Sequence, residues 1–568
     1  MEQREIESIL VADCGRIRTK VTLIDLVEGR YRFLAQGEAP GPGVSGEEDL
    51  ILSVRGATGQ IEEITGRRLL DDEGWPIIPE RDTGAGVDAF VATASAAPPL
   101  RTLLAGLAHD LSVESAREAI ESTYAVVEEV VALDRGLRLR DETICPEAIV
   151  IVGGTDGGAI SPLLDLTRLV APLISSTVSD STDDRRSRSS ISQADPGLHP
   201  RERLSEPVLG VAEPLAEGSA ESDGPTSSDE IRPTVIFAGN AEARLQVARL
   251  IGGEADLRIV DNIRPSLEVE NASPLQEEME EVYWERKMRR MPGFARLRAW
   301  TSVSIPPAAR AFAAVVRFLA RRHDLTVAAV DLGGGATTVV LADGSHFVRA
   351  MMTNTQGGVE ARDVLSPVWE RARRKWNPDG GLTPHLDLII GSGGALTPNL
   401  SSGQAALILL DVLQPCGVTN LALDPASLMP SLGALVACHP LAATQVLDRG
   451  CLLRLGPVIA PLGRARPGDL VLQLKMHRDD GSTEDIRVTY GAIQVIPLPP
   501  GRTARLELRP TRHFDVGLGV KGRGAVTEVE GGLLGLIIDA RGRPLGLPSE
   551  EERREWLAAM EAPVMMKR

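Results

Sequence analysis

The amino-acid sequence predicts an α/β protein with two related halves, for three reasons. A pattern of strand, glycine-containing turn, strand, hairpin turn and strand occupies residues 7–37, and it recurs at residues 326–350. Alternating strand and helix patterns fill much of the remaining chain. The 568 residues, 43% hydrophobic and 25% charged, suffice for a large buried core. Because the second pattern repeats the structural plan of the first without repeating its letters, we expect two homologous halves.

The first pattern begins with the apolar run at residues 8–12, which predicts a short buried strand. A polar turn at residues 13–18 follows, and residues 19–26 then alternate as a strand does. Glu28-Gly29 is typical of a hairpin turn, after which residues 31–35 predict the third strand.

The region between the two patterns reads as helical and α/β. Residues 112–133 have helical spacing and start with a serine suited to an N-cap. Residues 148–152 predict a buried strand before the glycine-rich turn 153–158, and residues 235–240 predict another strand and turn. Residues 175–232 contain no Phe, Tyr or Trp, so they cannot bury enough apolar surface to offset their ordering entropy. We therefore expect a disordered insertion inside an α/β domain.

The second pattern has the same parts. Residues 326–330 form an apolar run, residues 331–335 a glycine turn, and residues 337–342 a second strand. Asp343-Gly344 is typical of a hairpin turn, and residues 346–350 predict the third strand.

The rest of the chain begins α/β and becomes β-like. Residues 388–390 predict a strand, residues 391–394 a turn and residues 404–413 a helix. Residues 452–547 alternate and are rich in Gly and Pro, and residues 550–560 predict a closing helix. The chain is thus expected to have four parts: residues 1–110, residues 111–320 with the insertion at 175–232, residues 321–450, and a separate β-rich domain at 451–568.

Composition excludes some functions and compartments. The net charge of -18 disfavours nonspecific nucleic-acid binding, which needs a basic surface. None of the five cysteines forms a C-x-x-C pair, the N-terminus is polar and acidic, and no apolar run is long enough to span a bilayer. We expect a cytoplasmic protein with no nucleic-acid or membrane partner.

The first glycine turn combines a carboxylate with groups that bind phosphate. Asp13 opens it, Gly15 lies within it, and Thr19 and Lys20 begin the next strand. Glycine lets a phosphate approach the backbone N–H groups of such a turn. A carboxylate can hold Mg²⁺ through water, while Thr and Lys can donate to phosphate oxygens. For this segment alone, an ordinary β-turn with a solvated lysine remains the alternative.

The second glycine turn matches the first in its leading Asp331 and its closing threonines. Three consecutive glycines between apolar strands cost conformational entropy, which close approach of a ligand to the backbone would explain. A β-bulge is the alternative. The candidate residues here are Asp331, Gly333, Gly334, Gly335, Thr337 and Thr338.

A third small-residue turn follows the strand at residues 388–390. Such a turn can let an adenosine lie flat against the backbone, and the alternative is an ordinary strand-to-helix turn. Its candidate residues are Gly391, Ser392, Gly393 and Gly394. The order and spacing of the three turns are more specific than any one of them.

Together the three turns resemble the phosphate-1, phosphate-2 and adenosine motifs of the actin, sugar-kinase and heat-shock-chaperone ATPase superfamily. More narrowly, the chain resembles the glutamate-mutase accessory MutL family, which is unrelated to the mismatch-repair protein of that name. This resemblance covers about residues 7–440 apart from the insertion. The supporting segments are residues 93–100, 153–158, 238–241 and 261–265 and the turn that Asp331 opens.

The resemblance implies two ribonuclease-H-like domains around a nucleotide cleft, with ATP and Mg²⁺ as cofactors. Asp13 and Asp331 would be the catalytic carboxylates, holding Mg²⁺ through water. It further implies an accessory or reactivating ATPase for an adenosylcobalamin-dependent mutase, which uses ATP to shift domain closure and release damaged cofactor.

Two departures from the family pattern leave alternatives open. Arg16 stands after Gly15 where the family usually has a small hydroxyl residue, and Val339 follows Thr338 where an aspartate is common. Hydrolysis would then be slow or lost, which gives a nucleotide-sensing scaffold. A small-molecule kinase on the same fold is the other alternative.

Overall fold

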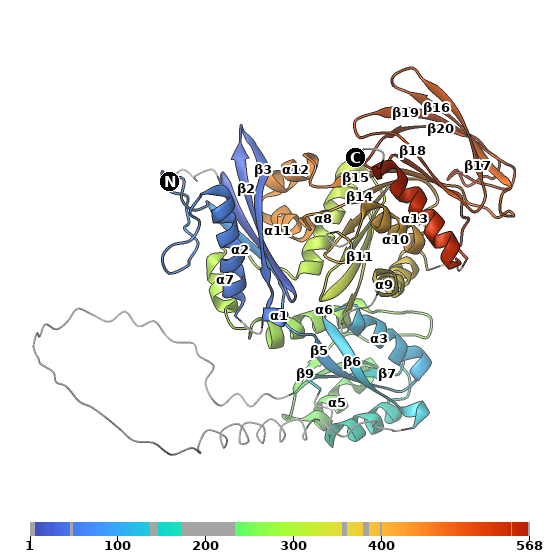
Figure 1. Cartoon of the computed structure of the whole chain (residues 1–568). Coiled ribbons are helices and arrows are strands. Elements are labelled where there is room, and N and C mark those ends of the chain that lie inside the picture. Colours follow the sequence, from blue (N-terminus) through green and yellow to red (C-terminus); the bar gives the residue numbers. More distant parts are fainter. Residues whose placement is uncertain are drawn as a thin grey trace, which may run out of the picture. The chain divides into compact units, whose positions relative to one another are not determined.

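A computed structural model of the chain shows two compact units (Figure 1). Unit 1 comprises Met1–Pro99, Glu121–Tyr124 and Tyr283–Arg568, and unit 2 comprises Leu100–Ile120 and Ala125–Val282. The structure describes residues 6–45, 49–136, 146–172, 174, 233–354, 360–378, 385–397, 400–546 and 548–565. The insertion expected at 175–232 lies outside them.

The first half of unit 1 contains the three predicted strands and one more. The strands are β1 (Ser8–Gly15), β2 (Arg18–Val27), β3 (Arg30–Pro40) and β4 (Ala89–Ser95). Their order is β3-β2-β1-β4, with antiparallel pairs among the first three and β4 parallel to β1. Helix α2 (Leu50–Thr65) runs along this sheet (Figure 1), and the Asp49 side chain caps it by accepting from Ile51 N at 2.9 Å.

The second half repeats this arrangement. Its strands are β10 (Val327–Leu332), β11 (Ala336–Ala342), β12 (Phe347–Thr353), β13 (Leu388–Ser392) and β14 (Gly417–Leu423). Their order, β12-β11-β10-β13-β14, has the same antiparallel meander and the same parallel fourth strand. The strand order thus confirms the prediction of two duplicated ribonuclease-H-like halves.

Two helices pack between the two sheets. They are α8 (Ala308–His323) and α11 (Met429–Cys438), and α12 (Pro440–Asp448) adds to the same layer. One hydrophobic cluster joins Val11 of the first sheet, Phe312 of α8, Leu432 of α11 and Val340 of the second sheet. Such burial, worth about 25 cal/mol per Å² of apolar surface, fixes both sheets against the shared helices.

The opposite face of the second sheet is covered by three further helices. These are α9 (Ala361–Trp376), α10 (Ser402–Leu413) and α13 (Glu550–Met565), which includes the predicted closing helix. A buried ion-pair group joins them to the sheet, since Arg541 pairs with both Asp539 and Asp411 at 2.9 and 2.5 Å. Each of these two carboxylates is bound to an arginine, which offsets the cost of burying its charge.

The C-terminal region is β-rich, as predicted, but its strands belong to two sheets. Strands β15 (Leu453–Ala460), β18 (Ile493–Ile496) and β21 (Leu536–Asp539) extend the second-half sheet beyond β14. The boundary expected at residue 451 therefore falls between two strands of one sheet. The other sheet has the order β17-β16-β19-β20, from β16 (Leu470–Arg478), β17 (Thr483–Thr489), β19 (Thr503–Pro510) and β20 (Ala525–Glu530).

Unit 2 is a parallel five-stranded sheet with the order β6-β5-β7-β8-β9. Its strands are β5 (Leu100–Gly106), β6 (Ala125–Ala132), β7 (Ala148–Gly153), β8 (Thr234–Gly239) and β9 (Asp256–Ile259). Its helices include α3 (Glu114–Glu121), α5 (Arg244–Ile251), α6 (Ser273–Tyr283) and a helix over residues 161–172.

The helix expected at residues 112–133 is wrong in its second half. A π-helical turn, His109–Val113, leads into α3, and the chain then enters strand β6. Valines at 126, 127, 130 and 131 satisfy helical spacing, yet their branched side chains also suit a strand paired with β5. None of the described helices has the length and apolar character needed to cross a bilayer.

Candidate functional site

The candidate site starts from two hairpins whose turns have equal length, one in each half of unit 1. In the first, Asp13 on β1 lies opposite Lys20 on β2. In the second, Asp331 on β10 lies opposite Thr338 on β11. The parallel fourth strands also correspond, because Thr93 is level with Asp13 and Ser392 with Asp331. The predicted motifs therefore occupy equivalent places in the duplicated fold.

The tips of the two hairpins touch. A Cβ atom added to Gly334 would lie 2.6 Å from Cγ1 of Ile17, and one added to Gly335 would lie 3.4 Å from Cβ of Arg16. A contact under 3.0 Å requires something to shift, so Gly334 makes room for Ile17. Close approach of the first hairpin, rather than of a ligand alone, explains this glycine.

A cavity of about 450 Å³ lies between the hairpins and the turn after β13. Its volume is within the range of small-molecule sites. Of the predicted residues, those lining it are Asp13, Gly15, Lys20, Asp331, Gly333, Gly334, Gly335, Thr338, Gly393 and Gly394. The three predicted motifs thus share one cavity.

Four predicted residues do not line the cavity. Thr19 and Thr337 are fully buried, and each is the strand neighbour of a residue that does line it. Because successive side chains on a strand point to opposite faces, these two threonines face away. A Cβ on Gly391 would meet three leucine side chains, and the Ser392 hydroxyl donates to Asp424. Both therefore belong to the packing behind the cavity.

Lys20 connects the first hairpin to the second half. Its Nζ donates to the carbonyl oxygen of Ala426 at 3.3 Å and lies 3.4 Å from Oε1 of Glu38. The side chain is 13% exposed and lines the cavity. These contacts hold a positive charge in the cavity wall beside Glu38, which lines the cavity as well.

Three neighbouring carboxylates have raised pKa values. Burial raises the pKa of Asp13 to about 6, against the lowering effect of Lys20. Burial, together with the charges of Asp13 and Asp424, raises the pKa of Asp331 to about 7. Burial also raises the pKa of Asp424. Like charges this close favour a bound cation or proton.

Asp424 is a residue that sequence reasoning missed. It follows β14, and its two carboxylate oxygens accept from Leu428 N and Met429 N, each at 2.9 Å. The Ser392 hydroxyl donates to it at 2.9 Å. An aspartate between an apolar strand and a helix that starts with Met-Pro is the signal that could have found it. It fixes the start of α11 and adds negative charge behind the cavity.

The turn after β13 closes against the second carboxylate. Gly393 has a φ of +95°, and a Cβ there would lie 2.5 Å from Oδ1 of Asp331. Nothing lies within 4 Å of a Cβ added to Gly394. Farther round the lining, Tyr124 stacks on Tyr283 with ring centroids 4.9 Å apart, and the Tyr124 hydroxyl accepts from Ala309 N at 3.0 Å. Both rings are buried, so a planar base has room over Gly394 rather than on the tyrosine pair.

The donor set fits Mg²⁺ held through water better than a direct metal cage. Asp13 and Asp331 both line the cavity and raise the local negative charge. Among the described residues, no group of three or more His, Cys, Asp or Glu side chains is arranged to hold a metal by itself. Mg²⁺ commonly keeps several waters and uses one or two carboxylates together with substrate phosphates.

A family model described as MutL protein matches residues 9–182 and 205–367, which is more than half of the chain. The chain belongs to the MutL protein family. No curated protein matches it. The matched residues include both hairpins and nearly all of the described part of unit 2.

Solved structures resemble this MutL family member only weakly. A nucleotide-free acetone carboxylase is 11% identical over 86% of this chain and 82% of that chain, with a TM-score of 0.33. A PPX-GPPA enzyme of Aquifex aeolicus is 9% identical over 69% and 70%, with a TM-score of 0.19. An exopolyphosphatase of Cytophaga hutchinsonii is 8% identical over 68% and 67%, with a TM-score of 0.17. Because these TM-scores are low, the assignment of the fold rests on the strand order and not on these structures.

Three other segments of the MutL resemblance, residues 153–158, 238–241 and 261–265, meet one another within unit 2. Asp156, in the turn after β7, accepts from Ala241 N and from Asn262 Nδ2, both at 2.9 Å. Asn262 also donates to the carbonyl oxygen of Gly154 at 2.9 Å. Through these bonds Asp156 joins the three loops that follow β7, β8 and β9, so its carboxylate has a scaffold role.

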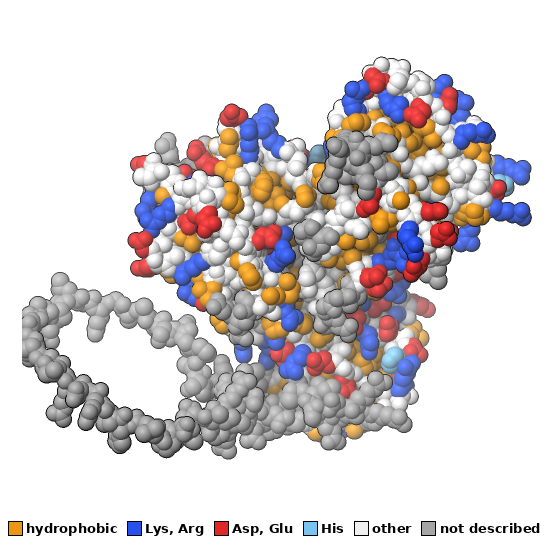
Figure 2. Space-filling model, viewed as in Figure 1, with side chains coloured by type: hydrophobic (Ala, Val, Ile, Leu, Met, Phe, Trp, Pro, Cys, Tyr) orange, Lys and Arg blue, Asp and Glu red, His pale blue; other side chains and the backbone are white. Residues whose placement is uncertain are grey.

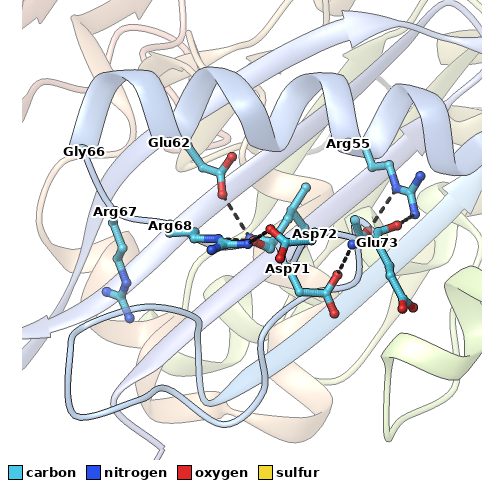
Figure 3. A pocket seen from close by; sticks show the side chains of 10 residues that line it. Arg55, Glu62, Gly66, Arg67, Arg68, Asp71, Asp72 and Glu73 are labelled. Atoms are coloured by element: carbon cyan, nitrogen blue, oxygen red, sulfur yellow. Dashed lines mark hydrogen bonds and ion pairs between the residues drawn. The ribbon is translucent and has the colours of Figure 1, made fainter.

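One large hollow elsewhere in unit 1 is lined by charged side chains that bind one another or their own loop. It measures about 580 Å³ and has charged walls at the end of α2 (Figure 3). Glu62 accepts from Leu69 N and Leu70 N, Asp71 accepts from Trp75 N, and Arg68 pairs with Asp72. Charged groups that already bind their own loop offer little to a ligand.

Proposed function

We propose that this MutL family member binds ATP with Mg²⁺ in the cavity between its two hairpins. The observation that carries the proposal is the meeting of both carboxylate turns and Lys20 in one cavity. Backbone N–H groups of the glycine turns would cradle the phosphates, and Lys20 and Thr338 would donate to phosphate oxygens. Gly393 and Gly394 would lie against the adenosine.

The metal would be held through water by Asp13 and Asp331. A bound Mg²⁺ supplies positive charge that offsets the phosphates and the two carboxylates. Without metal the pKa of Asp331 is about 7, and a bound Mg²⁺ would favour the ionised carboxylate. The chain's own contribution is to orient the phosphates and to hold the waters of the metal at Asp13 and Asp331.

The departure at Val339 does not weaken the site. Val339 is fully buried in the core of the second half, so a carboxylate at this position would face away from the cavity. Arg16, the other departure, lines the cavity and can pair with a phosphate. Loss of hydrolysis is therefore not required by either residue, and a turnover assay decides between ATPase and scaffold.

Calorimetric titration with Mg-ATP tests the binding. We expect one site per chain and a thermal shift, and Asp13→Asn should weaken the affinity at least tenfold, because it removes a charge from the metal site. Asp363→Asn, which changes an exposed aspartate on α9, is the matched control and should bind as the parent does. No heat and no thermal shift at millimolar Mg-ATP would end the proposal.

We propose further that the client is an adenosylcobalamin-dependent mutase, whose damaged cofactor is released as ATP turnover shifts domain closure. Membership of the MutL family supports this assignment. The test is co-purification of the full chain from its native host with and without Mg-ATP. Recovery of a mutase subunit in a nucleotide-dependent manner is the expected result, and recovery of the chain without any mutase contradicts it.

A small-molecule kinase would release ADP only when its metabolite substrate is added. A reactivating ATPase would hydrolyse ATP alone or on addition of its client. A metabolite screen for substrate-dependent ADP release separates the two.

A further inference from the structure

A groove of about 810 Å³ lies along one edge of the outer sheet, the sheet with the order β17-β16-β19-β20. All six residues of β20, Ala525–Glu530, line this groove. Because successive side chains of a strand point to opposite faces, a strand that lines a groove with every residue turns its edge toward it. The described lining residues of the groove include none from the cavity between the hairpins.

The edge of β20 that faces the groove has backbone groups without a partner strand. Strand β20 ends the outer sheet, and it pairs with β19 without irregularity. Just beyond the strand, Gly531 N donates to the carbonyl oxygen of Arg502 at 2.9 Å, and hydrogen-bonded pairs alternate along an antiparallel ladder. The residues that turn their N–H and C=O groups away from β19 are therefore Val526, Glu528 and Glu530. No backbone group in the described ranges bonds to these outward groups.

Apolar side chains remain partly exposed on both sides of the groove. Leu388 on β13 and Leu452 before β15 line it and are only partly buried. On the side of the outer sheet, Val526 is 59% exposed and Leu518 is 44% exposed. The part of the outer sheet in view at the upper right of Figure 2 also carries hydrophobic side chains among charged ones. A strand added beside β20 would bury apolar surface, which favours association.

Charged side chains on the exposed face of the outer sheet alternate in sign from strand to strand. Lys475 on β16 lies between Asp485 on β17 and Glu507 on β19. Likewise, Arg505 on β19 lies opposite Glu528 on β20, which has no described strand on its other side. Opposite charges at facing positions stabilise neighbouring strands. One further strand beside β20 would continue this pattern with a lysine or arginine opposite Glu528.

The other carboxylates that line the groove are already paired. The pairs are Glu530 with Arg454, Asp448 with Arg322, and Asp387 with His385. The carboxylate of Glu528 makes no ion pair or hydrogen bond with any described residue, and its side chain is exposed. It is therefore the groove's available partner for a cation.

We propose that this groove binds an extended peptide segment of a partner protein, which adds to the outer sheet as a strand beside β20. The outward N–H and C=O groups select a strand, and the apolar walls select apolar side chains at alternate positions. Glu528 selects a lysine or arginine between them. A second copy of this chain fits less well, because its own β20 would bring Glu528 and Glu530 in place of cations. The proposal does not depend on nucleotide binding.

A fluorescein-labelled hexapeptide of alternating lysine and valine, titrated with the nucleotide-free full chain at low and constant ionic strength, tests the groove. We expect a saturable rise in anisotropy with one probe per chain. Glu528→Lys should weaken binding roughly tenfold or more, because a repulsion replaces an attraction. Asp485→Lys is the matched control: it makes the same change at an exposed position of the other edge strand, also opposite a cation. It should change the affinity less than about twofold.

The absence of saturable binding, or an equal loss in both variants, would overturn the proposal. Both substitutions lie at exposed positions, so the midpoint of thermal unfolding of each variant should match that of the parent. This measurement shows that a loss of binding in Glu528→Lys does not come from unfolding.

Methylated probes test whether the peptide binds as a strand. A lysine that lies opposite Glu528 also turns its N–H toward β20, because facing residues of a hydrogen-bonded antiparallel pair bond to each other. N-methylation of the lysine residues should therefore abolish binding. N-methylation of the valine residues, whose N–H groups point away from β20, should leave the affinity within about threefold. Equal binding of the two methylated probes would show that charge alone attracts the peptide, and would overturn the added strand.

Sedimentation of the full chain, with and without excess probe, tests the second copy as the occupant. We expect the same oligomeric state in both samples, because the groove of the free chain is open. A dimer that the probe dissociates would assign the groove to a second copy and overturn the proposal. Mg-ATP is absent from every sample, so failure of the nucleotide site leaves these results unchanged.

Discussion

The two hairpins have turns of the same length that begin at an aspartate, yet they present different side chains. The first presents Arg16 and Lys20, whereas the second presents the glycine run 333–335 and Thr338. The glycines accommodate the tip of the first hairpin, since Ile17 lies where a Cβ of Gly334 would stand. In the proposed nucleotide site, the first hairpin would thus supply cations, and the second would supply room and hydroxyl or backbone donors. Such a site would need both halves.

The largest expected effect comes from making the first hairpin resemble the second in charge. Lys20→Met removes a cation from the cavity wall, so Mg-ATP affinity should fall on the order of 10–100-fold. Arg30→Met, an exposed change on the same sheet, should leave the affinity unchanged. Calorimetry measures both. Equal affinities for Lys20→Met and the parent would show that the hairpins do not differ in this way.

The second prediction concerns Asp331, the aspartate at the start of the second hairpin turn. The pKa of Asp331 is raised to about 7 in the folded chain, so the folded state binds its proton more tightly than the unfolded state does. Nucleotide-free stability should therefore fall as pH rises from about 4 to about 7 and then level off. Asp331→Asn cannot titrate, so its stability relative to the parent should be greater at pH 8 than at pH 5, by on the order of 1 kcal/mol or more.

Chemical denaturation without nucleotide at the two pH values measures this difference. Asp363→Asn is the exposed control and should show the same small difference from the parent at both values. A relative stability of Asp331→Asn that does not change with pH would contradict the buried, mutually repelling carboxylates.

A third prediction tests the contact between the tips. Gly334→Ala should destabilise the chain, because its Cβ meets Ile17 at 2.6 Å. Ile17→Ala removes the obstructing atoms, so the double variant should recover about 1 kcal/mol relative to additivity. A double-mutant cycle by denaturation gives the coupling. Additive effects would mean that the tips do not touch in solution.

The smallest expected effect comes from Thr338, whose side chain lies on the face of β11 opposite to that of Thr337. Thr338→Val should weaken Mg-ATP binding several-fold, by about the value of one hydrogen bond. Thr337→Val, the neighbour that faces away and donates to Asn354 Oδ1 at 3.3 Å, should leave the affinity within about twofold. The reverse order of effects would place the nucleotide on the other face of the strand.

The sequence predicted the parts that local patterns determine. Both hairpins, the strand that begins at Leu388 and helix α10 follow from short periodic segments and turn residues, although β13 runs on through Gly391 and Ser392, which were expected in the turn. The cavity-lining residues that head each turn, Asp13 and Asp331, were also found. Such features depend on residues close together in the chain.

The missed features depend on long-range pairing. Residues 125–132 fit a helix locally, and only pairing with β5 makes them strand β6. Asp424 matters because it lies near carboxylates from two other strands, which no local pattern reveals. Likewise, Thr19 and Thr337 were assigned to the ligand although the pleat turns them away from it.

Amide hydrogen exchange of the full chain, with and without Mg-ATP, tests most directly whether both hairpins hold one nucleotide. Slower exchange is expected together at residues 14–19, 333–337 and 393–395, with no change in the outer sheet that contains β17. Protection of one hairpin alone, or of neither at saturating Mg-ATP, would contradict the shared site.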